Sequence, residues 1–331
     1  MTIAPIRFAL FLCLLLACGS DESKKDDREK PPAGPAGVFH SLDRSAAQGF
    51  RGGQLAVGGG YVYWVNQPRI DQNGLGKSTL ERKRAEGGEV ETVAGPGDIY
   101  SIAADQGSVY WSDKRAVWSL PHGGDGGEPV KLTSGAMWLE VVPGKTHVFL
   151  RSSTRMALVP RTGGSEEMVW QGRRSKHHVI ADGDRFLVVE ESSERTAEPT
   201  GTLTAYQPGT APAVLVAGGP ATAAIGTDGD LIYVAGGRSI TPPLWRLPRS
   251  GGEPEQVGNP AWGFGEFVIA RGALYGMIFT NKWKLQKLPL DGGAPVVVDP
   301  LAGFSAMVTS FATDDRYVYF LTDFDVKRAP L

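Results

Sequence analysis

Two glutamates and a histidine are the side chains with the clearest potential for chemistry. Glu140, His178 and Glu266 each stand beside the first apolar residues of a short strand-like segment. Carboxylates and an imidazole act as general acids, general bases or metal ligands when a fold brings them together. Paired-carboxylate chemistry needs the two groups about 5 to 10 Å apart. Whether these residues meet depends on the elements that carry them.

Composition excludes several classes of protein. The 34 Lys and Arg residues nearly balance 36 Asp and Glu residues, and the net charge of −2 leaves no basic footprint for nucleic acid. Hydrophobic residues reach 41%, enough for a core, and 44 Gly with 23 Pro indicate many turns. The sequence has no Gly-x-Ser-x-Gly elbow and no Cys pair for zinc. We therefore expect no cofactor and no metal.

The start of the chain has the pattern of an export signal. An apolar run over residues 8–17 ends in Leu15-Leu16-Ala17-Cys18, and it is too short to span a bilayer. Leu-Leu-Ala-Cys resembles the bacterial lipoprotein signal box, in which the cysteine becomes the lipidated first residue. That resemblance implies a signal peptide over residues 1–17 and lipidation at Cys18. The alternative is an ordinary signal peptide cleaved beyond Cys18.

Residues 18–37 are predicted to be the lipidated Cys and a flexible tether. They mix five acidic and four basic residues with Pro, Ala and Gly, and a coil of this length spans on the order of 25 Å. Gly19 after the cysteine, by the same resemblance to sorted lipoproteins, favours the outer membrane of a bacterial cell envelope. Cys13 lies within the signal, so the processed chain forms no internal disulfide.

The rest of the chain, residues 38–331, repeats one pattern of strands and turns. An aromatic-rich strand recurs every 38 to 47 residues, with a mean of about 43. One column aligns Tyr63, Tyr110, Phe149, Leu187, Tyr233, Tyr275 and Tyr319. Gly-Gly turns follow at positions 87–88, 126–127, 163–164, 251–252 and 292–293, with Pro208-Gly209 in the fourth copy. Asp-Gly-Asp at 182–184 and 228–230 predicts tight hairpins.

Four short strands in each of seven repeats predict an all-β fold, a seven-bladed β-propeller of four-stranded antiparallel blades. The seventh copy stops at Leu331, before its outer strand. Residues 38–46 precede the first full blade, so we expect them to supply that strand and close the ring.

Three strand sequences resemble a known propeller family. YWVN at 63–66, YWSD at 110–113 and YFLTD at 319–323 are similar to the YWTD-type strand. TolB-like and NHL-like propellers of bacterial lipoproteins are comparably similar, so the resemblance identifies a superfamily. The middle copies depart from the motif, and YWTD domains have six blades. Such folds host scaffolds, receptors, lyases and hydrolases, so the resemblance transfers no activity.

The first strand of each blade should surround the ring's axis, and two adjacent columns in these strands differ in character. One is polar except at Ala224, and its polar members are Gln54, Ser101, Glu140, His178, Glu266 and Ser310. The next is wholly apolar: Leu55, Ile102, Val141, Val179, Ile225, Phe267 and Phe311. We expect the polar column to line the channel and the apolar column to pack between blades.

Three functions are open, and the third, after the two set out here, is a purely structural protein of the cell envelope. The leading hypothesis is a non-enzymatic propeller that binds a protein, peptide or glycan partner through loops entering the first strands, with the oligomeric state undetermined. Its proposed binding residues are Trp138, Arg173, Arg174, Lys176, Trp262 and Phe264. The two tryptophans have a second interpretation, in which they cover the channel mouth and shield the core. The competing hypothesis is a hydrolase or lyase using Glu140, Glu266 and His178 at the channel mouth.

Overall fold

A computed structural model describes most of the repeat region. Every described residue lies within the unit Ala33–Leu331. The described ranges are 37–41, 54–66, 77–123, 127–135, 137–172, 177–191, 200–220, 222–236, 243–257, 267–279, 283–291, 293–298, 308–322 and 325–331. None of these residues forms a helix long and apolar enough to cross a bilayer.

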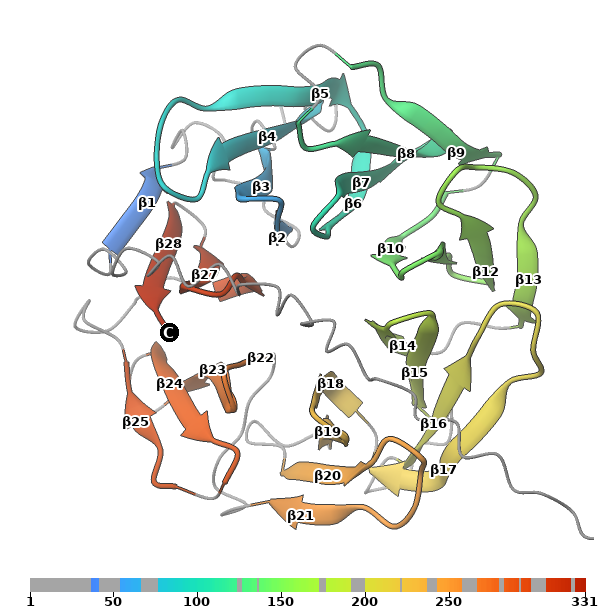
Figure 1. Ribbon diagram of the computed structural model, residues 1–331, viewed down its shortest axis with the longest axis vertical. Helices are drawn as coiled ribbons and strands as arrows, with labels where there is room; N and C mark the ends of the chain where they lie inside the picture. Colours follow the sequence, from blue (N-terminus) through green and yellow to red (C-terminus); the bar gives the residue numbers. More distant parts are fainter. Residues whose placement is uncertain are drawn as a thin grey trace, which may run out of the picture. The chain divides into compact units, whose positions relative to one another are not determined.

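The strands form seven four-stranded antiparallel sheets arranged as the blades of a propeller (Figure 1). Blade 1 contains β2 (Leu55–Gly58), β3 (Tyr61–Asn66), β4 (Ser78–Arg84) and β5 (Glu91–Gly97). Blade 2 contains β6 (Ile99–Ala104), β7 (Ser108–Asp113), β8 (Ala116–Pro121) and β9 (Val130–Ser134). Blade 3 contains β10 (Glu140–Pro143), β11 (His147–Arg151), β12 (Arg155–Pro160) and β13 (Glu167–Gln171).

The remaining blades follow the same order from the axis outward. Blade 4 contains β14 (His177–Asp182), β15 (Arg185–Glu191), β16 (Thr200–Tyr206) and β17 (Ala213–Pro220). Blade 5 contains β18 (Thr222–Asp228), β19 (Leu231–Gly236), β20 (Leu244–Pro248) and β21 (Glu255–Val257). Blade 6 contains β22 (Phe267–Ala270), β23 (Ala273–Phe279), β24 (Trp283–Pro289) and β25 (Val296–Val297). The predicted seven-bladed all-β fold is confirmed.

Blade 7 is completed by the start of the chain. It contains β26 (Val308–Thr313), β27 (Tyr317–Thr322) and β28 (Asp325–Pro330), and β1 (Gly37–Ser41) pairs antiparallel with β28. Gly37 lies opposite Arg328, and Ser41 lies opposite Asp325. The predicted closing strand is therefore confirmed for residues 38–41 and begins one residue earlier; residues 42–46 lie outside the described ranges. The pairing covers an edge of β28 that would otherwise expose its backbone groups.

The aromatic column lies in the second strand of every blade and is buried throughout. Its seven residues have between 0 and 2% of their surface exposed. Each pairs with the residue that follows the apolar column of the first strand, as Tyr63 does with Ala56 and Tyr319 with Ala312. The sequence alignment therefore matches the structural register in all seven blades.

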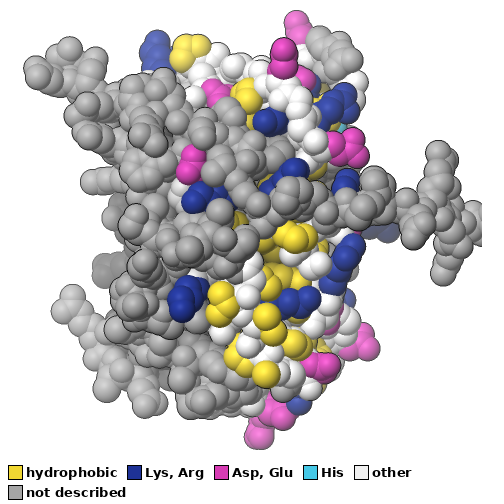
Figure 2. Space-filling view, turned by 90° about the vertical axis from the view of Figure 1, so that its left-hand side faces the viewer, with side chains coloured by type: hydrophobic (Ala, Val, Ile, Leu, Met, Phe, Trp, Pro, Cys, Tyr) yellow, Lys and Arg dark blue, Asp and Glu magenta, His cyan; other side chains and the backbone are white. Residues whose placement is uncertain are grey.

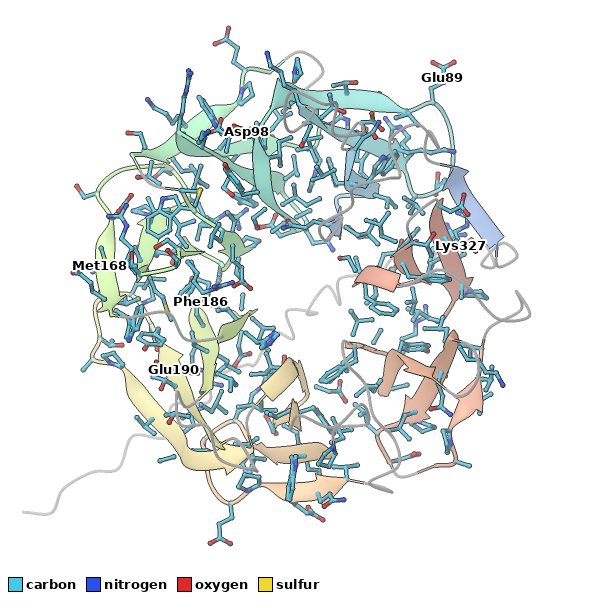
Figure 3. The ribbon with its side chains drawn as sticks, turned by 180° about the vertical axis from the view of Figure 1, so that it is seen from behind. Glu89, Asp98, Met168, Phe186, Glu190 and Lys327 are labelled. Carbon is cyan, nitrogen blue, oxygen red and sulfur yellow. The ribbon has the colours of Figure 1, made fainter. Side chains whose placement is uncertain are left out.

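Hydrophobic packing lies between blades. Seven clusters of buried residues each combine side chains from two adjacent blades. Each contains one member of the apolar column, Phe311 being the partly buried one, which confirms the prediction that this column packs between blades. Phe186, labelled in Figure 3, belongs to the cluster between blades 3 and 4, and the centroid of its phenyl group is 5.4 Å from that of Phe149. Met168, also labelled, lies at the outer edge of the propeller.

The predicted turns that the structure describes in full lie at the ends of strands. Gly251 follows β20 with a φ of 91°, and its backbone N–H donates to the carbonyl of Pro248 at 2.9 Å. A Cβ at this position would lie 2.9 Å from the carbonyl oxygen of Leu215 in blade 4. Both the backbone conformation and the neighbouring blade therefore require glycine there.

Candidate functional site

The predicted polar column lies at or near the beginning of the innermost strands (Figure 1). Each innermost strand has a single neighbour within its own sheet. Alternate backbone N–H groups on its free edge therefore lack a ladder partner and need another acceptor. Glu266 lies outside the described residues, whereas Gln54, Ser101, Glu140, His178 and Ser310 are described.

Gln54 connects blade 1 to blade 2. Its amide Nε2 donates to the carbonyl of Tyr100 at 2.6 Å, and its Oε1 accepts from the backbone N–H of Ile102 at 2.5 Å. The pairing of β6 with β7 is irregular between Ile99 and Ser101, so the Tyr100 carbonyl lies at a bulge. One side chain thus satisfies two backbone groups of the neighbouring blade.

Two serines make the equivalent contact in neighbouring blades. Ser310 Oγ in blade 7 accepts from the N–H of Leu55 in blade 1 at 3.2 Å. Ser101 Oγ in blade 2 accepts from the N–H of Val141 in blade 3 at 3.0 Å. Leu55 and Val141 belong to the apolar column, as does the Ile102 bonded by Gln54. The polar column therefore joins blades 7, 1, 2 and 3 in succession, each side chain reaching the next innermost strand.

Glu140 has a different partner. Its Oε2 accepts from Arg151 Nε at 2.5 Å, and the side chains keep 26% and 21% of their surface exposed. Glu140 and Arg151 are paired residues of β10 and β11. Desolvation near the axis raises the pKa of the Glu140 carboxyl, and the Arg151 guanidinium opposes that rise.

Arg151 was not among the predicted residues, although a signal for it exists. Arg151 lies two positions after Phe149, the aromatic-column residue of this blade. In the antiparallel pair of β10 and β11, that position lies opposite Glu140 of the polar column. Applying the register of the first two strands to the sequence would have placed a cation beside Glu140.

The proposed catalytic residues are only partly brought together. Glu140 begins β10 and the half-buried His178 is the second residue of β14, and these two innermost strands lie side by side. Glu140 carries a guanidinium rather than an imidazole as its closest charged partner. Within the described ranges, no three His, Cys, Asp or Glu residues form a group that would hold a metal ion.

Trp138 requires a correction, because a fully buried ring offers no surface to a partner. Its exposure is 0%, and it packs in the cluster between blades 2 and 3. The guanidinium of Arg155 lies over the ring at 4.6 Å, and the Trp138 carbonyl accepts from Ser112 Oγ at 2.7 Å. The structure thus agrees with the second interpretation, a tryptophan that shields the core. The preceding residue, Met137, is 46% exposed, and the sequence analysis did not name it as a binding residue.

The other five proposed binding residues lie outside the described ranges: Arg173, Arg174, Lys176, Trp262 and Phe264. Exposed hydrophobic residues elsewhere lie mainly on or beside outer strands, such as Val296 and Val297 on β25, which are 53% and 49% exposed. Figure 2 faces the left-hand side of Figure 1. It shows hydrophobic side chains gathered on that face, with Lys and Arg side chains among them.

A second polar link between blades 1 and 2 centres on His122, which follows β8 and is 6% exposed. Its Nε2 lies 2.7 Å from the carbonyl oxygen of Asp105, so this nitrogen carries the proton. Its Nδ1 then accepts from the Tyr63 hydroxyl at 2.6 Å. Burial lowers the pKa of His122 and raises the pKa of Tyr63 to about 12. The imidazole is therefore held neutral as part of the blade interface.

Comparison with known proteins supports the fold and leaves the family open. No protein-family model matches the sequence, and no curated protein sequence matches it. Puromycin hydrolase has a similar structure, with a TM-score of 0.64 at 14% identity over 90% of this chain and 55% of that one. The chain thus spans about half the length of that hydrolase. A Pyrococcus horikoshii acylaminoacyl peptidase gives a TM-score of 0.63 at 12% identity, over 87% of this chain and 52% of that one.

One similar structure is a propeller domain alone. The β-propeller domain of the Trilobed protease from Pyrococcus furiosus has a TM-score of 0.63 at 13% identity, over 84% of this chain and 93% of that one. That domain is described as having an open velcro topology. Here β1 pairs with β28 and closes blade 7. These identities establish a shared fold and no more.

Proposed function

We propose that this protein is an exported lipoprotein, tethered through Cys18 to the bacterial cell envelope, whose propeller serves as a binding or scaffold module. One observation carries the proposal. Gln54, Ser101 and Ser310, three members of the polar column on or beside the innermost strands, are engaged in hydrogen bonds between blades. These residues hold the frame together, which leaves recognition to the loops that enter the innermost strands.

The proposed partner is a protein, peptide or glycan that binds Arg173, Arg174, Lys176, Trp262 and Phe264. Aromatic side chains and arginines are the residue types enriched in binding hot spots. The combined change Arg173→Glu and Arg174→Glu is expected to abolish partner capture by the full chain. Lys145→Glu, an exposed position in the β10–β11 turn, is the matched control and should leave capture unchanged. Equal capture by both variants would contradict the proposed surface.

The anchor has its own test. Cys18→Ala should move the protein from the membrane fraction into the soluble fraction of the producing cells, because the thioether-linked lipid would be lost. Cys18→Ser is a second variant that keeps the size of the side chain and should behave identically. Retention of either variant on the membrane would contradict lipidation at this residue.

The alternative function is a hydrolase or lyase that uses Glu140, Glu266 and His178. The adjacency of the β10 and β14 strands that carry Glu140 and His178 favours it, together with the likeness to the β-propeller domain of a protease. A panel of chromogenic esters and aminoacyl anilides tests it directly. Turnover that disappears in both Glu140→Gln and His178→Asn would support this alternative; turnover unaffected by either change would exclude these residues.

A further inference from the structure

Glu140 differs from the three residues of the polar column that bond to the next blade. In blades 7, 1 and 2, the column side chain accepts from a backbone N–H of the next innermost strand. In blade 3, Glu140 Oε2 accepts from Arg151 of its own blade instead. The corresponding N–H in blade 4 is that of Val179, and among the described residues no bond joins it to Glu140. The succession of axial hydrogen bonds from blade 7 to blade 3 therefore stops before blade 4.

The pair of Glu140 and Arg151 leaves several hydrogen-bonding atoms unused. A bond of 2.5 Å joins Arg151 Nε to Glu140 Oε2 across the paired strands β10 and β11. Within the described ranges, nothing accepts from Arg151 Nη1 or Nη2, and nothing donates to Glu140 Oε1. These three atoms keep some exposed surface, and 21% of the Arg151 side chain is exposed. The guanidinium thus presents its two terminal NH₂ groups near the axis, where a ligand can reach them.

The unused atoms favour a ligand that accepts hydrogen bonds. The two terminal groups of Arg151 carry four N–H donors, whereas Glu140 Oε1 is one acceptor. The N–H of Val179 is a further donor on β14, the innermost strand beside β10. A planar guanidinium fork matches a carboxylate, which accepts two parallel bonds of about 2.7–2.9 Å. Because Arg151 Nε already offsets the negative charge of Glu140, a second carboxylate at the fork does not meet an unpaired charge.

The sequence around this point is also basic. Arg173, Arg174 and Lys176 directly precede β14 in the chain, and His177 and His178 begin that strand. A concentration of positive charge attracts an anionic group and increases the rate at which it arrives. Both the guanidinium fork and this basic run therefore favour a negatively charged partner.

We propose that Arg151, held by Glu140, binds a carboxylate of a peptide partner at the point where the axial hydrogen bonds are interrupted. Nε stays bonded to Glu140, and Nη1 and Nη2 donate to the two oxygens of the ligand. This inference rests on the proposed binding function and narrows its partner to a peptide with a free C-terminal carboxylate or an acidic side chain. Every peptide chain ends in such a group, whereas a neutral glycan has none.

The test is a calorimetric titration of the full chain with N-acetyl-L-alanyl-L-alanine, which ends in a free carboxylate. The control ligand is its C-terminal amide, which has nearly the same shape and no charge. The acid is expected to bind at millimolar concentration, because a short probe makes few contacts, and the amide at least tenfold more weakly. Equal binding of acid and amide, or no binding of the acid, would overturn the proposal. Glucuronate that binds tenfold more tightly than the peptide acid would contradict a peptide partner and favour an acidic glycan.

Variants locate the site. Arg151→Gln should reduce binding of the acid at least tenfold. Because that change leaves Glu140 without its partner, the double variant Arg151→Gln with Glu140→Gln removes both charges and should show the same loss in a chain that still folds. Arg246→Gln is the matched control, since Arg246 Nε donates to Glu255 Oε2 at 2.9 Å across the paired strands β20 and β21, and it should bind the acid as the unmodified chain does. Undiminished binding by the double variant would exclude the site.

The titration is separate from the tests of the proposed function. It uses a small probe instead of the whole partner, and it does not depend on a lipid at Cys18. Capture that depends on Arg173 and Arg174, without binding of the acid, would overturn this site and leave the proposed function standing. Binding of the acid without such capture would support the site and contradict the proposed surface.

Discussion

Removing the Gln54 side chain is the most direct test of the hydrogen bonds between innermost strands. Gln54→Ala eliminates the bonds to Tyr100 and Ile102 and leaves both backbone groups of blade 2 without that partner. Each bond contributes about 1 kcal/mol net, and a buried group left unpaired costs about 1–3 kcal/mol. Because Gln54 is only half-buried, water can replace part of the loss. We expect the free energy of unfolding to fall by about 2 kcal/mol.

The assay is urea unfolding followed by tryptophan fluorescence, with a thermal melt as a second measurement. A loss of this size lowers the melting temperature by roughly 4–8 °C in a domain of 150–250 residues, and by less in a longer one. Gln256→Ala is the matched control, because Gln256 is exposed on the outer strand β21. If the two variants differ by less than about 0.5 kcal/mol, Gln54 does not hold blades 1 and 2 together.

Three further changes probe other parts of the ring. Deleting residues 38–46 should lower the melting temperature substantially, because β28 loses its outer neighbour β1; an unchanged melt would count against closure by β1. Trp138→Ala should cost about 3–5 kcal/mol in a urea titration, since the ring is fully buried, and a loss below about 1 kcal/mol would place it outside the core. Because the folded protein holds His122 with a lowered pKa, the unfolded chain gains a proton first, and stability should fall as the pH drops below about 6.5. Urea titrations from pH 8 to 5 should show a smaller fall in His122→Gln, and identical pH profiles would refute this role.

The sequence was sufficient to predict the blades because their signal is repeated. One aromatic position recurs in seven copies, so an error in any single copy leaves the alignment intact. The alternation of polar and apolar columns also specified the register of the innermost strands. A shift by one residue would place the polar column in the core between blades and the apolar column at the axis. The ring closure followed from counting strands: the last copy lacked one, and the segment before Leu55 had no other sheet to join.

The candidate site was less predictable because its contacts join different blades. The polarity of Gln54 and Ser101 was visible in the sequence, but their partners are backbone groups of the next blade, whose distance no sequence pattern states. Trp138 presents the same difficulty, because its environment also depends on a neighbouring blade. A tryptophan in a loop reads equally as a binding residue or as a core residue, and its orientation depends on the space that blades 2 and 3 leave between them.

The distribution of packing explains why the closing strand matters for the whole ring. Every hydrophobic cluster within the described residues draws on two adjacent blades, so no cluster there belongs to one blade alone. Blade 7 contributes Tyr319 to the cluster it shares with blade 1 and Phe320 to the one it shares with blade 6. Loss of the outer strand β1 would expose β28, which contributes Val326 to the first of these clusters and Ala329 to the second, so both interfaces would weaken at once. This coupling makes the stability of the propeller a property of the closed ring rather than a sum over seven independent sheets.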